Sequence, residues 1–323
     1  MSENLPVHPS LLSGWDNLPP QEGLVQTGNA PLDEGKNIPE CDARQESFTP
    51  RNDIDRISDL MAQENAILCG DALETLKTLP DERFACCITS PPYWQSDYSG
   101  KYYILGAEHD PNEYVTTLSR VFREVRRTLA PHGTLWLVLG DAYAPHDPHW
   151  WEMFTKKIDD EPFESRVIPR GFKPHDTMGM PWRVALALQN DGWYLRSDII
   201  WSIPNYPLEA NKDRPDRMHN YIFLLAKSER HLYNAHTIDT LSRRTVWEIP
   251  TELKTPIRYT VFPEPLVERC IRAGSKKDDV VLDPFFGSGT VGIVAKRLKR
   301  RYVGIEIDPK AVNVAGKRIR ERG

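Results

Sequence analysis

Short apolar runs, rich in β-branched residues, alternate with longer helical patterns from about residue 61 to the end of this 323-residue chain. Such alternation is typical of a mostly parallel sheet with helices on both faces, and it predicts a doubly wound α/β fold. Proline opens several of the predicted helices, which cover 111–129, 181–190, 291–300 and 309–320. We expect a seven-stranded sheet, with strands at 66–69, 85–89, 134–139, 195–203, 221–226, 280–282 and 302–305.

The first 60 residues differ in composition from the rest of the chain. They hold seven prolines and 11 of the 46 acidic residues, but only 4 of the 41 basic residues. Because they also show little apolar periodicity, residues 1–60 are predicted to form an irregular or partly disordered arm before one folded domain over 61–323. The net charge of −5 comes from this arm, since the remaining chain holds 35 acidic and 37 basic residues. The overall charge therefore does not exclude a polyanionic partner.

The hydropathy pattern and the cysteines exclude several classes of protein. No apolar run approaches the roughly 18 residues that span a bilayer, and the N-terminus lacks the basic and apolar regions of a signal peptide. We therefore expect a cytoplasmic protein with no membrane contact. The cysteines are odd in number and lack paired CxxC spacing, so neither a disulfide framework nor a zinc site is expected at Cys41, Cys69, Cys86, Cys87 and Cys270.

A predicted strand, a glycine-rich loop and a helix start follow one another in the segment VVLDPFFGSGT, residues 280–290. Gly287 and Gly289 let a ligand approach the backbone, and the helix N-terminus offers unpaired N–H groups and partial positive charge for a carboxylate. A second predicted strand ends at Glu306 about 20 residues after Asp283, a spacing used to bind ribose hydroxyls. The segment indicates a nucleoside ligand, although an ordinary strand-to-helix turn is the alternative for the loop alone.

The second chemical signal is the segment SPPY at residues 90–93, which follows the predicted strand 85–89. Strand ends line the ligand crevice of an open α/β sheet, so this corner is expected near the distant glycine loop. Two prolines fix the backbone and remove two N–H donors, which leaves carbonyl acceptors and a hydroxyl in a rigid array that suits an amino group. The alternative is a Pro-Pro turn whose Tyr93 and Trp94 pack against the core.

Together these two segments resemble the exocyclic-amino DNA methyltransferases, in particular their circularly permuted beta group. The catalytic motif of that family, Ser/Asn/Asp-Pro-Pro-Tyr/Phe, matches residues 90–93, and its cofactor loop, Asp-Pro-Phe-x-Gly-Ser-Gly-Thr, matches residues 283–290. In the beta group the catalytic motif precedes the cofactor loop, as it does here. Arg258 departs from the family, which often has His at that place. Further likenesses are Gly70-Asp71-Ala72, Leu139-Gly140-Asp141, Asp198-Ile199-Ile200-Trp201 and Phe262-Pro263-Glu264.

The resemblance implies a circularly permuted, Rossmann-like methyltransferase fold that uses S-adenosyl-L-methionine and no metal. In the family pattern, Glu306 binds the ribose hydroxyls, Asp71 binds the adenine amino group, and Asp283 binds the methionine end together with the loop glycines. The residues expected at the cofactor are Asp71, Phe262, Asp283, Pro284, Phe285, Gly287, Ser288, Gly289, Thr290 and Glu306.

The resemblance also implies the catalytic residues, which are Ser90, Pro91, Pro92 and Tyr93. The lone pair of an aromatic amino group is delocalised into the ring, so the group is a poor nucleophile. We expect the Ser90 hydroxyl and the Pro91 carbonyl to accept hydrogen bonds from its N–H groups and to favour tetrahedral geometry at nitrogen. Tyr93 is expected to stack on a base that has flipped out of the duplex.

The expected partner is double-stranded DNA. Cytosine N4 is favoured over adenine N6 because serine at the first motif position is commoner among N4 enzymes of the family. An RNA or protein amide methyltransferase and a non-catalytic nucleic-acid-binding module remain alternatives. Methylation of cytosine C5 is disfavoured, because it needs a nucleophilic cysteine that normally follows a proline, and the chain has no Pro-Cys pair.

Two segments outside the shared motifs are expected to contact DNA, near 145–176 and 204–217, because aromatic or polar side chains mix there with basic ones. For the first segment, a solvated surface insertion is the alternative. The family also leads us to expect a prokaryotic or phage source, a companion restriction endonuclease, and a monomer or homodimer.

Overall fold

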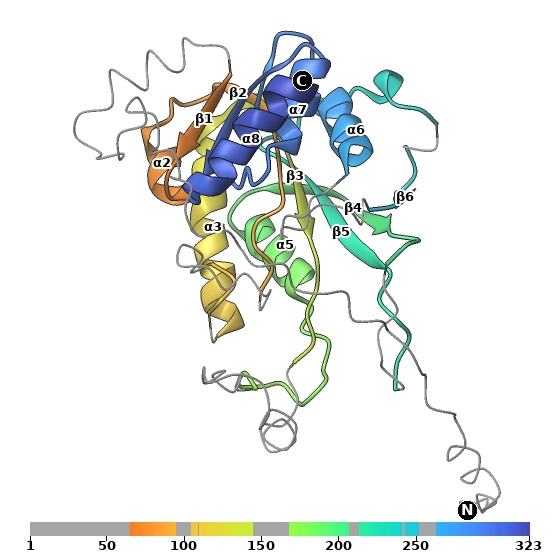
Figure 1. Cartoon of the computed structure of the whole chain (residues 1–323). Coiled ribbons are helices and arrows are strands. Elements are labelled where there is room, and N and C mark those ends of the chain that lie inside the picture. Colours follow the sequence, from red (N-terminus) through yellow and green to blue (C-terminus); the bar gives the residue numbers. More distant parts are fainter. Residues whose placement is uncertain are drawn as a thin grey trace, which may run out of the picture. The chain divides into compact units, whose positions relative to one another are not determined.

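The computed structural model in Figure 1 describes the chain over residues 65–94, 105–108, 110–144, 168–206, 213–240, 243–251 and 263–323. The predicted arm over 1–60 lies outside these ranges, and so does the greater part of the predicted insertion 145–176. Within the described ranges, no helix is long and apolar enough to cross a membrane.

One mixed sheet runs through the described part of the chain, with the strand order β1-β8-β7-β2-β3-β5-β4-β6. Neighbouring strands are parallel except at β5, which is antiparallel to both β3 and β4. The expectation of a mostly parallel sheet is confirmed. The strands are β1 (Ala66–Cys69), β2 (Phe84–Thr89), β3 (Leu129–Leu139), β4 (Tyr194–Ser202), β5 (His219–Ala226), β6 (Val246–Glu248), β7 (Val280–Asp283) and β8 (Arg301–Glu306).

The expected number of seven strands was wrong, because the sheet has eight strands in the described ranges. The additional strand is β6, a three-residue segment that pairs in parallel with the outer side of β4. A run of three residues is too short to show the alternation that distinguishes a strand from a loop in sequence. The other seven strands overlap the seven predicted segments.

Helices cover both faces of the sheet, as expected (Figure 1). The helices α2 (Ala72–Thr78), α3 (Pro111–Thr128) and α5 (Met180–Asn190) bury their apolar residues in one core cluster. The helices α6 (Glu264–Gly274), α7 (Thr290–Arg297) and α8 (Pro309–Arg322) do so in a second cluster on the opposite face. A short 3-10 helix, η2, spans Ala235–Thr237.

The strand sequences explain the two cores. Along β3, Leu135 and Leu137 belong to the cluster with α3, whereas Trp136 and Val138 belong to the cluster with α6. Both sides are apolar because successive side chains point to opposite faces and neither face meets water. The helix α6 was not predicted, although four buried residues recur there at helical spacing, namely Leu266, Val267, Cys270 and Ile271.

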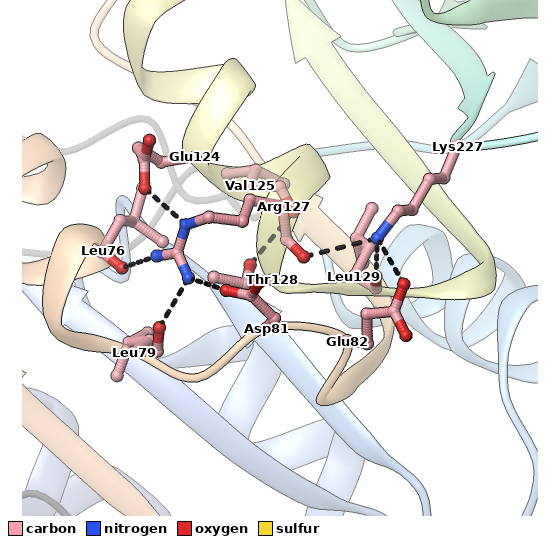
Figure 2. Close-up of polar contacts among 10 residues, drawn as sticks. All are labelled: Leu76, Leu79, Asp81, Glu82, Glu124, Val125, Arg127, Thr128, Leu129 and Lys227. Atoms are coloured by element: carbon pink, nitrogen blue, oxygen red, sulfur yellow. Dashed lines mark hydrogen bonds and ion pairs between the residues drawn. The ribbon is translucent and has the colours of Figure 1, made fainter.

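Arg127, near the end of α3, fastens the connection between α2 and β2 (Figure 2). Its guanidinium donates hydrogen bonds to the carbonyls of Leu76 and Leu79, at 2.7 and 2.9 Å. Leu76 lies in the last turn of α2, where its carbonyl also accepts the backbone N–H of Leu79, and Leu79 is the C-cap of the helix. The same group pairs with Glu124 at 2.8 Å and with Asp81. Arg127, near the end of α3, therefore holds the C-terminal end of α2 through two backbone carbonyls.

Lys227, which follows β5, adds contacts to the same connection between α2 and β2 (Figure 2). Its ammonium donates to the carbonyl of Leu129 at 2.6 Å and pairs with Glu82 at 3.5 Å. Together the two cations hold the entry to β2 against the ends of α3 and β5. The far end of β2 leads directly into the candidate active site.

Candidate active site

The SPPY corner and the glycine loop lie at the same edge of the sheet. Strands β2 and β7 are parallel neighbours, with Cys87 opposite Leu282, so their carboxyl ends emerge side by side. The Thr89 hydroxyl, at the end of β2, donates a 2.7 Å hydrogen bond to the carboxylate of Asp283, at the end of β7. Both residues are buried. The spatial prediction is confirmed, because Ser90 directly follows a residue in contact with the cofactor loop.

The corner itself is fixed by contacts from outside the motif. The buried Tyr114 of α3 donates its hydroxyl to the Pro92 carbonyl at 2.8 Å. Pro91 is buried, whereas Ser90 and Tyr93 are partly exposed. Their hydroxyls are 3.4 Å apart, with Ser90 as the donor. The turn therefore presents a serine and a tyrosine that already contact each other.

Trp94 packs in the core beneath the SPPY corner. Its side chain is buried, and its Nε1–H donates to the Glu108 carbonyl at 3.0 Å. The Glu108 carboxylate accepts a 2.7 Å hydrogen bond from the Gly106 backbone N–H. Burial raises the pKa of Glu108.

Asp283 is a buried carboxyl group at the centre of the site. Its side chain accepts hydrogen bonds from the Thr89 hydroxyl and, at 3.1 Å, from the Phe285 backbone N–H. Burial raises its pKa to about 7, although both hydrogen bonds oppose the shift, and nearby Glu306 adds to it. A carboxyl group with a pKa near neutrality and a fixed orientation can accept or release charge when a cation arrives beside it.

Glycine is needed at positions 287 and 289 of the loop for different structural reasons. Both have positive φ, 49° at Gly287 and 81° at Gly289. A Cβ on Gly289 would lie 2.9 Å from that of Ala315, so this glycine lets α7 pack on α8. A Cβ on Gly287 would meet no atom within 4 Å. The space beside Gly287 is where a ligand can approach the backbone closely.

Glu306 fastens the glycine loop to the end of β8. Its carboxylate accepts hydrogen bonds from the backbone N–H groups of Gly287 and Asp308, at 2.7 and 2.9 Å. Because Asp283 lies opposite Gly304 in the register of β7 and β8, the two acids stand at the same sheet edge. The predicted pair of acids after adjacent strands is therefore present.

Asp71 lies two strands away from Asp283 at the same edge. It follows β1, whose Cys69 is opposite Glu306, and it caps α2 by accepting the Glu74 backbone N–H at 3.0 Å. Asp71 is exposed at this end of the sheet. The remaining predicted cofactor residues of the loop, Pro284, Phe285, Ser288 and Thr290, occupy the turn between β7 and the first residue of α7.

Two of the residues predicted at the cofactor, Ser288 and Phe262, need separate comment. Ser288 is held by α8, since Arg318 donates to both its carbonyl and its hydroxyl, at 2.6 and 2.5 Å. Phe262 lies outside the described residues. In the part of the chain that is described, no group of three or more His, Cys, Asp or Glu side chains is placed to hold a metal ion.

Residues 213–217, one of the two described ends of the predicted segment 204–217, lie against Tyr143 and Asp141. The guanidinium carbons of Arg214 and Arg217 lie 3.8 and 4.3 Å from the ring centroid of Tyr143. Arg217 also donates a hydrogen bond to the carbonyl of Asp141. Asp141 in turn accepts the backbone N–H of Met180 at 2.8 Å. Residues 207–212 of this segment lie outside the described ranges.

Comparison with known proteins identifies the family. The model of the N6/N4 family, described as a DNA methylase, matches residues 84–317. The chain belongs to the N6/N4 DNA methylase family. This methyltransferase is 44% identical over 265 residues to the type II methyltransferase M.SmaI of Serratia marcescens, covering 79% of this chain and 91% of the relative. It is 40% identical over 263 residues to M.Cfr9I of Citrobacter freundii, covering 77% and 86%.

Solved structures agree with the fold. A DNA modification methylase of Thermus thermophilus, TTHA0409, in complex with S-adenosyl-L-methionine, is 28% identical with a TM-score of 0.58 over 80% of this chain and 94% of that one. The PvuII DNA methyltransferase, described as cytosine-N4-specific, has a TM-score of 0.59 at 21% identity, over 80% and 94%. The enzyme is therefore a DNA methyltransferase of the exocyclic-amino class, and it uses S-adenosyl-L-methionine.

Proposed function

We propose that this methyltransferase methylates the N4 amino group of a flipped cytosine in double-stranded DNA, at a site formed by the SPPY corner and the glycine loop. The observation that carries the proposal is the hydrogen bond between Thr89 and Asp283, which holds the two segments together. Serine at position 90 supports cytosine N4 over adenine N6. A protein of the same fold, the PvuII DNA methyltransferase, is described as cytosine-N4-specific.

The residues of the corner prepare the amino group. The Ser90 hydroxyl and the Pro91 carbonyl accept its N–H groups, so that the nitrogen lone pair leaves the ring system and points away from the corner. The nitrogen would then take the methyl group as the bond from the methyl carbon to sulfur breaks, which would leave the neutral thioether S-adenosyl-L-homocysteine, and the proton released from the nitrogen would pass to solvent water. Tyr93 stacks on the base, and the turn at Pro92 is kept rigid by Tyr114.

The cofactor supplies a methyl group made electrophilic by a sulfonium. The residues of this chain suit it, because open space lies beside the Gly287 backbone and a buried carboxyl group, Asp283, stands ready for an ammonium group. Glu306 would hold the ribose hydroxyls and Asp71 the adenine amino group. Gly289 and the other predicted loop residues shape the turn, and Phe262 stays a predicted cofactor residue outside the described ranges.

The order of the strands supports a circularly permuted chain. The strands that carry Asp283 and Glu306, β7 and β8, come last in the sequence but lie in the sheet between β1 and β2. The catalytic corner thus precedes the cofactor loop in sequence while both stay adjacent in space. We assign residues 61–323 to this one catalytic domain.

DNA contact is assigned to the segment 204–217, where Arg214 and Arg217 lie over Tyr143. Arginine suits phosphate and base edges alike, and Arg217 is anchored on the carbonyl of Asp141, the residue after Gly140. The relatives named as type II methyltransferases support a companion restriction endonuclease.

The proposal is tested by incubating the purified enzyme with unmethylated plasmid DNA and S-adenosyl-L-methionine, then identifying the methylated nucleosides by mass spectrometry. We expect N4-methyldeoxycytidine, its loss in Ser90→Ala, and its retention in Ser197→Ala, a partly exposed serine on β4. N6-methyldeoxyadenosine as the product would overturn the target base. Methyl transfer to RNA or protein but not to DNA would overturn the proposal as a whole.

A further inference from the structure

The hydroxyl of Tyr93 lies between two other polar side chains. Ser90 donates to its oxygen from one side at 3.4 Å, and the side-chain amide of Asn220 donates to the same oxygen at 3.5 Å. Both contacts are at the long end of the hydrogen-bond range. Such contacts commonly shorten when substrate closes a catalytic site. Asn220 therefore reaches Ser90 through one shared oxygen atom.

Asn220 has no part in the motifs that the sequence displays. It lies on β5 and is buried, with 6% of its surface exposed. Strands β3 and β5 are antiparallel with Leu139 opposite Tyr221, so Gly140 continues the register opposite Asn220. A buried amide must be hydrogen-bonded to be tolerated, and Tyr93 is the partner seen for its nitrogen.

Gly140 completes the seat of the tyrosine ring. A Cβ at this position would lie 2.6 and 2.8 Å from the ring carbons Cε2 and Cδ2 of Tyr93, and 2.9 Å from the side-chain oxygen of Asn220. Real side chains essentially never approach a Cβ this closely, so the ring would have to move. The ring of Tyr93 thus rests on a glycine backbone while its hydroxyl is held by Asn220.

We propose that Asn220 is a positioning residue of the target-base pocket, which acts on Ser90 through the Tyr93 hydroxyl while Gly140 seats the ring. The inference rests on the function proposed above. A serine hydroxyl has one proton and two acceptor lone pairs. When its proton points to the Tyr93 oxygen, both lone pairs of Ser90 remain for the amino group of the base. By donating to the Tyr93 oxygen, Asn220 holds that oxygen in position to accept the Ser90 proton.

The inference predicts an energetic coupling that a merely structural residue would not show. Asn220→Ala and Tyr93→Phe each remove one end of the contact but leave the stacking ring in place. We expect each to lower kcat for DNA methylation roughly 10-fold, with KM for DNA and for the cofactor within about twofold of wild type. The double variant should be no slower than Tyr93→Phe alone, because the same interaction is already lost.

Controls separate this result from a loss of folding. Asn220→Asp keeps the shape but removes the amide donor, so it should reproduce the loss of kcat even if Asn220→Ala folds poorly. Asn112→Ala, an exposed asparagine at the start of α3, should leave kcat unchanged. Gly140→Ala should fold and lose at least about 100-fold in kcat, since the displaced ring removes both stacking and alignment.

Two outcomes would overturn the inference. In one, Asn220→Ala retains wild-type kcat; in the other, its effect multiplies independently with that of Tyr93→Phe. Either result leaves the proposed function intact provided that the wild-type enzyme methylates DNA. Absence of DNA methylation by the wild-type enzyme would instead remove the function itself.

Discussion

Thr89 and Asp283 are 194 positions apart in sequence, yet the threonine hydroxyl donates a buried 2.7 Å hydrogen bond to the aspartate carboxylate. One residue belongs to the strand that ends in the catalytic corner, and the other belongs to the strand that ends in the cofactor loop. The bond thus joins the two halves of the proposed reaction at the ends of neighbouring parallel strands.

Replacing Thr89 by valine tests this bond with little change of shape. Asp283 would keep its buried position but lose a donor that lowers its pKa, so its ionised form would become harder to reach. We expect the Kd for S-adenosyl-L-homocysteine to rise about 10-fold, which corresponds to the roughly 1.4 kcal/mol of one such hydrogen bond. Titration calorimetry measures it. Thr116→Val, an exposed threonine of α3, is the matched control, and equal affinities of the two variants would contradict the prediction.

The raised pKa of Asp283, about 7, predicts how stability depends on pH. An aspartate in the unfolded chain has a pKa of about 3.9, so between these values the folded protein holds a proton that the unfolded chain has lost. The contribution of Asp283 is therefore fully present below about pH 4 and is lost as the pH rises to about 7. The stability of Asp283→Asn does not fall in this way, because an asparagine side chain does not titrate. Urea unfolding should show the variant gaining stability relative to wild type between those pH values, and a constant difference would contradict the assignment.

The two loop glycines should fail in different ways. Alanine at either position is strained by its positive φ, at roughly 1 kcal/mol. Gly289→Ala also collides with Ala315, so its free energy of unfolding should fall by at least about 2 kcal/mol. Gly287→Ala faces open space, so its stability should change less while its Kd for S-adenosyl-L-homocysteine rises at least about 10-fold. Thermal unfolding and calorimetry on both variants check this, and equal stability losses would refute the distinction.

Arg127 is predicted to matter for folding and not for chemistry. Its guanidinium satisfies two carbonyls at the end of α2 and pairs with two carboxylates (Figure 2). Arg127→Ala should lower the free energy of unfolding by about 2 kcal/mol, and Arg127→Lys should recover only part, since an ammonium cannot reproduce the planar fork. Arg123→Ala, which removes an exposed pair with Asp191, should be close to neutral in urea unfolding. A kcat changed by more than about twofold in folded Arg127→Lys would contradict the purely structural role.

The sequence was sufficient to predict a mostly parallel sheet and the approximate place of the site. The apolar strands at 85–89 and 280–282 end directly before the two motifs, and parallel strand ends share one edge of a sheet. Periodicity also separated most helices from strands. It failed for β6, which is too short to have a period, and α6 was overlooked even though its apolar spacing is helical.

The contacts that support the site could not be predicted in the same way. Thr89 stands next to the corner, but nothing in its neighbours indicates a bond to a residue 194 positions away. Tyr114 and Asn220 reach the corner from α3 and β5, and their roles depend on the packing of those elements against β2 and β3. Gly140 stood in a segment that resembled the family, yet its close contact with the Tyr93 ring is a property of three-dimensional packing.

The most direct test of the account is a crystal structure of the enzyme with S-adenosyl-L-homocysteine. We predict that the ligand lies along the carboxyl ends of β7, β8 and β1, with its amino group on Asp283, its ribose on Glu306 and its sulfur facing the Ser90 hydroxyl. A ligand bound elsewhere, or one whose sulfur is screened from Ser90 by protein atoms, would contradict the claim that the SPPY corner and the glycine loop form one catalytic site.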